Sequence, residues 1–310
     1  MAMHARRSAL KWTRLTLGLL LIPWLPIGAA EGPGFWTTSA SILRFRDESN
    51  RPFPPVHVAG NIYHVGAADL AVFLITTPAG HILLDSGFEE TVPLIRTNIH
   101  RLGFKLEDVK ILLASHAHMD HVSGHAEIRR LTGAKVMAME MDADVLAAGG
   151  KGDFRWEKEA GWAPVPVDRV LKDGDTVTLG GTCLMARLTP GHSKGSTTWT
   201  TAVEEGGRTW QVVFAGSPNI NDGVVLVNNP KYPSIAADYE RTFRVLKSLP
   251  CDIFLTGHGT GFGLEEKARR VTANSGRNPF IDPEGYRGFI ERAERTFRER
   301  VRAERDASSR

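Results

Sequence analysis

The chemistry in this sequence is concentrated in the six residues that follow a short apolar run. The run at residues 110–115 (KILLAS) leads directly into the segment HAHMDH, which places four side chains able to bind a metal in six positions. His116 and His118 are two positions apart and can share one face of an extended segment. After a turn, Asp120 and His121 can bind a second metal ion nearby. The spacing therefore predicts two neighbouring metal centres at the end of a strand.

Two more histidines follow strand-like runs in the same way, His192 in LTPGHSKG and His258 in FLTGHGTG. Five imidazoles and one carboxylate suit zinc better than calcium, magnesium or copper. Two centres with three protein ligands each leave positions for water, and a pair of zinc ions can activate water and polarise a carbonyl. The sequence thus predicts a metal-assisted hydrolase. The remaining candidates are expected to be surface or core histidines: His57, His64, His81, His100 and His125.

The elements that must position these residues alternate between strand-like and helical patterns, which predicts an α/β or α+β domain without an internal linker. Strands are expected at 61–66, 71–76, 81–85, 110–115, 134–139, 170–179, 182–188, 196–203, 210–216 and 251–256. Helices are expected at 92–102, 123–131, 142–148, 235–246 and from 282 to near the end of the chain. Asp282 and Pro283 have the residue types of an N-cap and a first helical turn.

The formal net charge of +3 over 310 residues depends on the two ends of the chain. Residues 1–30 contain four basic residues and no acid. The basic residues all lie within the first 14 positions, and an apolar run at 15–22 and small residues at 28–30 come after them. This pattern predicts a signal peptide at 1–30, a mature domain at 31–310, export to the periplasm and no stable membrane association afterwards. An Arg-rich stretch occupies 287–310, and the body between has 26 basic against 30 acidic residues, which does not indicate a nucleic-acid partner. Cys183 and Cys251 could pair or be small buried side chains.

The H-x-H-x-D-H segment, the two later histidines and the turn HILLDSG, with Asp85 and Gly87, resemble the metallo-β-lactamase superfamily over roughly residues 50–300. The resemblance implies a single-domain α/β fold, a four-layer αββα sandwich, with a dinuclear zinc site at one edge of the sheets. Members similar to glyoxalase II, lactonases and processing nucleases carry a bridging Asp where this chain has Ser217. Subclass B1 β-lactamases carry a Cys ligand there.

With His121 beside Asp120 and Ser217 at that position, the chain resembles class B, subclass B3 metallo-β-lactamases. This resemblance implies two zinc ions, one bound by His116, His118 and His192 and the other by Asp120, His121 and His258. It also implies opening of a β-lactam amide by a zinc-bound hydroxide that Asp120 orients. Ser217 and Asn219 are candidates for binding the substrate carboxylate, or they cap a loop. Val224 stands where some members place a Tyr near the developing oxyanion.

Two rival interpretations of the same residues stay open. The first is an exported hydrolase of the same fold that acts on a lactone or thioester, although the missing bridging Asp disfavours it. The second is a zinc-binding module without turnover, although the complete set of six ligands disfavours that. The expected partner is a small-molecule substrate, and the oligomeric state is open.

Overall fold

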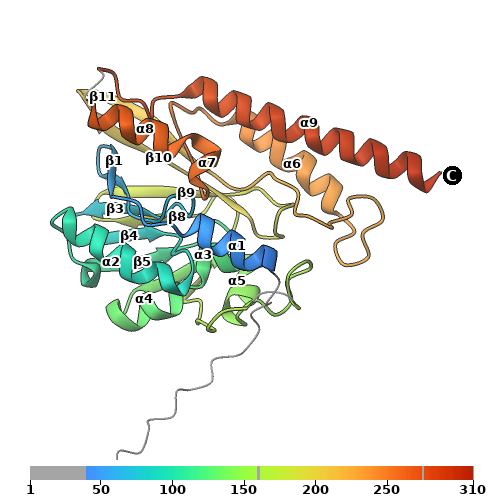
Figure 1. The fold of residues 1–310 in the computed structure, drawn as a ribbon, viewed down its shortest axis with the longest axis horizontal. Helices are drawn as coiled ribbons and strands as arrows, with labels where there is room; N and C mark the ends of the chain where they lie inside the picture. Colours follow the sequence, from blue (N-terminus) through green and yellow to red (C-terminus); the bar gives the residue numbers. More distant parts are fainter. Residues whose placement is uncertain (1–39, 159–160, 274–275, 310) are drawn as a thin grey trace, which may run out of the picture. The chain divides into compact units, whose positions relative to one another are not determined.

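The computed structural model describes residues 40–158, 161–273 and 276–309, which belong to one compact unit. The predicted signal peptide lies outside these residues. Two β-sheets pack against each other and helices cover their outer faces (Figure 1), which confirms the predicted αββα sandwich.

The first sheet has seven strands in chain order, antiparallel from β1 to β4 and parallel from β4 to β7. They are β1 (Val56–Ala59), β2 (Ile62–His64), β3 (Phe73–Thr77), β4 (Gly80–Leu84), β5 (Val109–Leu113), β6 (Lys135–Met139) and β7 (Arg169–Leu171). Helices α2 (Val92–Arg101), α4 (His125–Thr132) and α5 (Glu140–Ala147) lie between the parallel strands in the chain, because parallel strands need crossover connections. Leu83 packs in the helix-side core, whereas Ile82 and Leu84 pack in the core shared with the second sheet.

The second sheet has five strands in the order β12-β11-β10-β9-β8. They are β8 (Thr176–Leu179), β9 (Thr182–Leu188), β10 (Thr197–Glu205), β11 (Arg208–Ala215) and β12 (Ile253–Thr256). Gly206 and Gly207 have φ of 60° and 71° and form the tight turn of the β10–β11 hairpin, because glycine adopts positive φ without strain. Helix α6 (Ile235–Ser248) connects β11 to its parallel neighbour β12.

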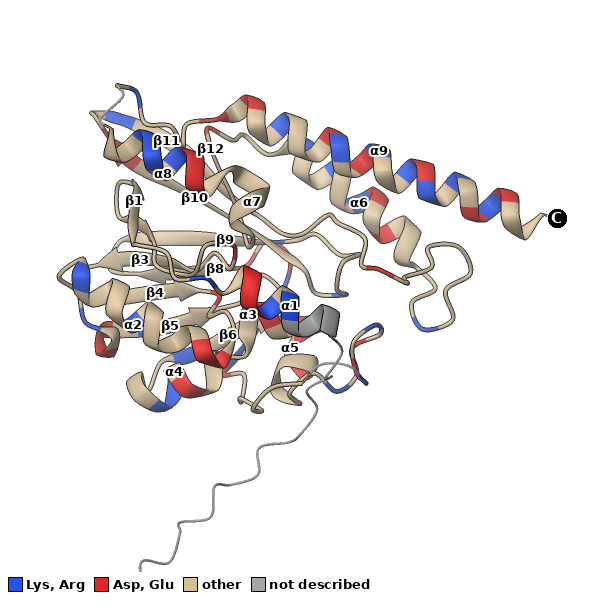
Figure 2. Ribbon diagram, viewed as in Figure 1, with Lys and Arg blue, Asp and Glu red and all other residues tan. Residues whose placement is uncertain are grey.

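The Arg-rich C-terminal stretch forms the helix α9 (Pro283–Ser308), which packs beside α6. It begins as predicted, with the Asp282 carboxylate accepting a hydrogen bond from Gly285 N at 2.8 Å. Figure 2 shows that acidic and basic residues alternate along its length. Its buried residues include Tyr286, Phe297 and Val301, so one face is packed and its arginines belong to a solvated, charge-balanced face.

One predicted strand is wrong as a single element. Residues 170–179 split at a turn in which Lys172 N donates to the Asp175 carboxylate and Gly174 has φ of 88°. The first part, β7, joins the seven-stranded sheet, and β8 pairs with β9 in the other sheet. The predicted helix at 123–131 begins earlier, as α3 (Met119–Val122) followed by α4. Elements that periodicity does not predict are β1, α1 (Ala40–Ser49), α7 (Gly259–Phe262), α8 (Leu264–Thr272), and the short 3-10 helices η1 (Glu89–Thr91) and η2 (Leu106–Asp108).

Both cysteines are free thiols, Cys183 exposed and Cys251 partly buried, so they do not pair. Within the part of the chain that the structure describes, no helix combines the length and the apolar character needed to cross a membrane.

Candidate metal centre

The six predicted ligands meet at the carboxyl ends of strands β5, β9 and β12. His116 and His118 follow β5, and the short helix α3 then carries Asp120 and His121. That turn forms because His121 N and Val122 N both donate to the carbonyl of His118, at 3.0 and 3.1 Å. His192 follows β9 and His258 follows β12. Residues far apart in the sequence are therefore brought together by the ends of strands in two different sheets.

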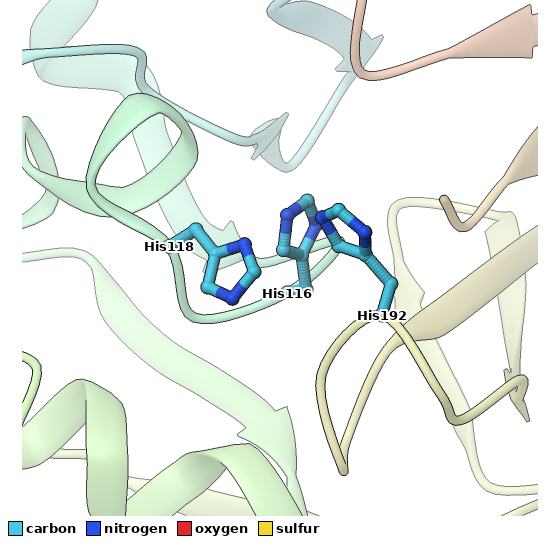
Figure 3. A group of neighbouring side chains, drawn as sticks. All are labelled: His116, His118 and His192. Atoms are coloured by element: carbon cyan, nitrogen blue, oxygen red, sulfur yellow. The ribbon is translucent and has the colours of Figure 1, made fainter. Parts of the chain in front are cut away.

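These side chains form two neighbouring groups, and within each group the candidate ligand atoms all lie within 4.8 Å of one another. One group is His116, His118 and His192, whose imidazoles converge from two loops (Figure 3) with ring centroids 4.5 to 4.8 Å apart. The other group is Asp120, His121 and His258. The rings of His116 and His121 are 4.1 Å apart, so the two groups are adjacent. This is the arrangement of a centre that holds two ions close together.

Each imidazole has one ring nitrogen turned toward a polar partner, through a hydrogen bond for four of them and through an ion-pair contact without hydrogen-bond geometry for His118. The pairs are His116 Nδ1 with Ser115 Oγ (3.1 Å), His118 Nε2 with Asp153 Oδ2 (3.5 Å), His121 Nδ1 with Asp85 Oδ2 (3.0 Å), His192 Nδ1 with the Asn219 carbonyl (2.7 Å) and His258 Nδ1 with Asp69 Oδ2 (3.0 Å). A nitrogen that faces a carboxylate or carbonyl oxygen must carry a proton, so the opposite nitrogen is the one that can bind a metal.

Asp85 supports both groups from a left-handed backbone conformation, with φ of 63°. Its Oδ1 accepts from Ser115 N and its Oδ2 from Ser115 Oγ, both at 2.7 Å, beside the contact with His121. Ser115 Oγ gives its proton to Asp85 and therefore accepts from His116 Nδ1. A non-glycine residue in this region costs on the order of 1–3 kcal/mol, which these buried hydrogen bonds offset.

The electrostatics differ between the two groups. Burial, reinforced by the neighbouring imidazoles, lowers the pKa of His116 well below its usual value and that of His192 to about 3. Burial opposes charge in the other group as well, but the carboxylate of Asp120 outweighs it. The pKa of His121 is raised to about 10 and that of His258 to about 9, while the pKa of Asp120 itself is held well below its usual value. At neutral pH and without a metal, the three-histidine group is thus neutral, whereas the other group contains an ionised carboxylate beside two protonated imidazoles, which release a proton when a metal binds.

The hydrogen bonding of the imidazole nitrogens indicates, independently of the sequence motif, that these residues can hold metal ions. His116 Nε2 in one group is buried and has no hydrogen-bond partner within the described residues, and His121 Nε2 in the other is buried and faces only the Asp120 carboxylate, at 3.3 Å and without hydrogen-bond geometry. Buried polar atoms are nearly always paired, so an unpaired imidazole nitrogen in each group indicates the place of a cation.

A cavity of about 590 Å³ opens over both groups. Ser217 and Asn219, the predicted substrate contacts, both line it, together with the aromatic side chains of Phe45 and Trp156. Its volume falls in the range of about 300–1,000 Å³ that small-molecule sites occupy. Val224 is only 3% exposed and is not among the described residues that line this cavity.

Several residues of the site were not predicted from the sequence. The motif pointed to Asp85 without a role, and nothing singled out Asp69, Asp153 or the two aromatic residues. Among the described residues, none of the five histidines expected to be surface or core residues belongs to a group that could hold a metal. His64 and His125 are fully buried, whereas His57 and His100 are exposed.

The model of the metallo-beta-lactamase superfamily matches residues 70–258, which is more than half of the chain. The chain belongs to this superfamily, as its resemblance predicted. It is similar to the FEZ-1 metallo-beta-lactamase from Legionella gormanii, with 44% identity over 83% of this chain and 98% of that chain and a TM-score of 0.81. It is also similar to the class B3 di-zinc metallo-beta-lactamase LRA-12 from an Alaskan soil metagenome, with 37% identity over 81% and 95% of the two chains and a TM-score of 0.76.

Curated sequences give shorter matches. A hydroxyacylglutathione hydrolase from Methylobacterium sp. (strain 4-46) is 32% identical over 97 residues, which is 31% of this chain and 30% of that protein. The chain thus aligns with less than a third of the length of this relative. The fold and the two groups define a metallo-hydrolase, and its substrate is a separate question.

Proposed function

We propose that this protein is a zinc-dependent β-lactamase that opens the amide bond of β-lactams. The observation that carries the proposal is the second metal group, Asp120, His121 and His258, with Ser217 where a bridging Asp or a ligand Cys stands in related hydrolases. The similarity to metallo-beta-lactamases over nearly their whole length supports it.

One ion would be held by His116, His118 and His192 and the other by Asp120, His121 and His258. Zinc bound there lowers the pKa of water toward neutrality and polarises the carbonyl of the substrate. The second partners of the imidazoles, Asp69 and Asp85 among them, hold a proton on the opposite ring nitrogen, fix the orientation of the rings and make the ligating nitrogens more basic.

The chain's own residues supply binding and orientation. Asp120 is ionised because its pKa is depressed, so its carboxylate accepts a hydrogen bond from the attacking water and aligns it. Ser217 and Asn219 line the cavity next to His258 and would bind the carboxylate that β-lactams carry. Phe45 and Trp156 offer apolar surface to the rest of the substrate and reduce its contact with water.

The test is hydrolysis by the purified protein of a penicillin, a cephalosporin and a carbapenem, each with and without a chelator. His116→Ala and His192→Ala should abolish most turnover while the protein stays folded, and His100→Ala, at an exposed position of α2, should match the wild type. Turnover that survives complete removal of zinc, or unchanged turnover in both ligand variants, would contradict the proposal.

The second candidate is hydrolysis of a thioester, which the partial similarity to hydroxyacylglutathione hydrolase favours. A lactone is the related alternative. The same preparation should therefore be assayed on S-lactoylglutathione and a homoserine lactone. Faster turnover of either than of every β-lactam would select that candidate, and stoichiometric zinc without turnover would indicate a binding module.

We further propose that residues 1–30 are a signal peptide and that the mature domain begins near residue 31 in the periplasm. The basic, apolar and small-residue segments in that order support this. Sequencing the N-terminus of the protein recovered from a periplasmic extract tests it, and an intact N-terminus on cytoplasmic protein would refute it.

A further inference from the structure

A buried carboxylate beneath the metal centre joins the two loops that carry the three-histidine group. Asp142 is the third residue of α5 and is 3% exposed. Its Oδ1 accepts from Gly195 N at 2.7 Å, and its Oδ2 accepts from Ala117 N at 2.8 Å and from Ser193 Oγ at 2.7 Å.

This carboxylate does not serve its own helix. An acid in a first helical turn ordinarily caps free N–H groups of that helix or interacts with its dipole. No side-chain cap bond is present at the start of α5, and the three hydrogen bonds described for Asp142 all reach residues outside the helix. The residue therefore connects other segments of the chain.

The two connected segments are those that hold the metal ligands. Ala117 lies between His116 and His118, and Ser193 follows His192 directly. Figure 3 shows His192 on a loop that faces the one bearing the other two histidines. The ring of His192 lies 4.7 Å from that of His116 and 4.8 Å from that of His118, so the spacing of the three rings is set by the separation of the loops.

The packing around Gly195 shows that this separation is tightly defined. A Cβ added to Gly195 would come within 2.5 Å of Asp142 N and within 2.7 Å of its Cβ and Cγ. The His192 loop thus rests directly on Asp142, and only a residue without a side chain can approach so closely. Asp142 and Gly195 make one contact in which each constrains the other.

We propose that Asp142 is a positioning residue, which holds the His116–His118 segment and the His192 loop at the separation that binds a metal ion. The inference rests on the proposed function, because it takes these histidines as zinc ligands. None of the hydrogen bonds described for Asp142 reaches Asp120, His121 or His258, so the second ion should be independent of it.

The test measures zinc affinity rather than activity. Zinc-free protein is titrated with zinc against a chromogenic chelator, which resolves two affinities, and cobalt(II) spectra of the same samples report the ligand geometry of each ion. Asp142→Asn keeps the shape of the side chain but places an amide N–H₂ against a donor. The affinity for the three-histidine ion should fall 10- to 100-fold, which is about the effect of losing a residue that orients ligands, with the other ion unchanged.

Asp168→Asn is the matched control, because Asp168 also accepts a backbone N–H, from Val136 at 2.9 Å, but on the far side of β6 from the metal ligands. It should leave both affinities as in the wild type. Equal affinities in Asp142→Asn and wild type, or an equal loss of both ions, would overturn the inference.

If Asp142→Asn does not fold, Ser193→Ala decides the question, since it removes one of the three hydrogen bonds without a buried charge change. It should weaken the same ion and leave the other unchanged, and unaltered binding would overturn the inference. A wild-type protein that binds fewer than two zinc ions would instead overturn the proposed function, and the inference with it.

Discussion

Replacing Asp69 by Asn should weaken the metal group of Asp120, His121 and His258 by changing which nitrogen of His258 carries the proton. Asp69 Oδ2 accepts from His258 Nδ1 at 3.0 Å, while Oδ1 accepts from Thr260 N at 2.9 Å and from Thr260 Oγ1 at 2.7 Å. The Thr260 donors would hold the carbonyl oxygen of the introduced Asn in place of Oδ1. Its amide nitrogen would then face His258 Nδ1.

Two donors cannot share that contact, so His258 would move its proton to Nε2. That atom lies 3.5 Å from Asp120 Oδ2, on the side of the metal group, and a protonated Nε2 cannot bind a metal. To bind a metal through Nε2, His258 must return its proton to Nδ1, where it opposes the amide N–H₂ of the introduced Asn. The variant then lacks the hydrogen bond from Nδ1 to the Asp69 carboxylate, and a hydrogen bond to a charged group contributes about 1.5–3 kcal/mol. Since each tenfold change in affinity is about 1.4 kcal/mol, the loss should be about 10- to 100-fold.

The assay is the zinc competition described for Asp142, followed by hydrolysis rates at limiting and at excess zinc. Excess zinc should restore most of the activity of Asp69→Asn, because the defect is in affinity. Thr260→Val is the control: it removes one donor to Asp69 but leaves the contact with His258, and should bind both ions normally. Two unchanged zinc affinities in Asp69→Asn would refute the reasoning.

Three further outcomes are expected. Burial lowers the pKa of His64 to about 3. Below about pH 6.5, His64 is therefore protonated in the unfolded chain but stays neutral in the folded chain, so the free energy of unfolding falls as the pH drops from about 6.5 toward 3. Urea unfolding of the metal-free protein measures the free energy of unfolding at about pH 7 and about pH 5. The decrease between these two pH values should be about 2 kcal/mol smaller in His64→Leu than in wild type. Glu304, on α9, accepts from Leu226 N at 2.7 Å and Val227 N at 2.9 Å, so Glu304→Gln should lower the unfolding free energy measured in urea by about 1–3 kcal/mol. Removing zinc with a chelator should lower the melting temperature in calorimetry, because it leaves buried imidazole nitrogens without a partner.

The sequence was sufficient to predict which six residues the fold brings together in the two candidate metal groups, because four of the six stand in one short segment. The other two each follow an apolar run before a glycine-containing turn, and the ends of strands are where such side chains converge. The hairpin turns and the start of α9 were predictable for a similar reason, since Gly206, Gly207, Asp282 and Pro283 determine structure through their immediate neighbours.

The residues that hold the ligands in place were not predictable, because their role depends on packing between distant segments. Asp69 precedes its partner His258 by 189 positions. Asp142 looks in the sequence like any acid near the start of a helix, and only the fold shows that its oxygens point to two other loops. The division of residues 170–179 between two sheets depends on the same long-range packing, since both halves have strand-like residues.

The charges around the cavity connect the metal centre to the choice of substrate. Its described lining contains three aspartates, Asp120, Asp153 and Asp222, against one arginine, Arg155. Without a metal, His258 in the lining is also protonated at neutral pH because its pKa is raised to about 9, which leaves three negative charges against two positive ones. A β-lactam carries a carboxylate, so the protein groups alone would disfavour its approach. Two divalent cations reverse the sign of the local field, since they contribute more positive charge than the aspartates contribute negative charge. If the protein acts as proposed, zinc should therefore be required for binding an anionic substrate as well as for the chemistry, and an anionic hydrolysis product should bind the zinc-loaded protein but not the zinc-free protein.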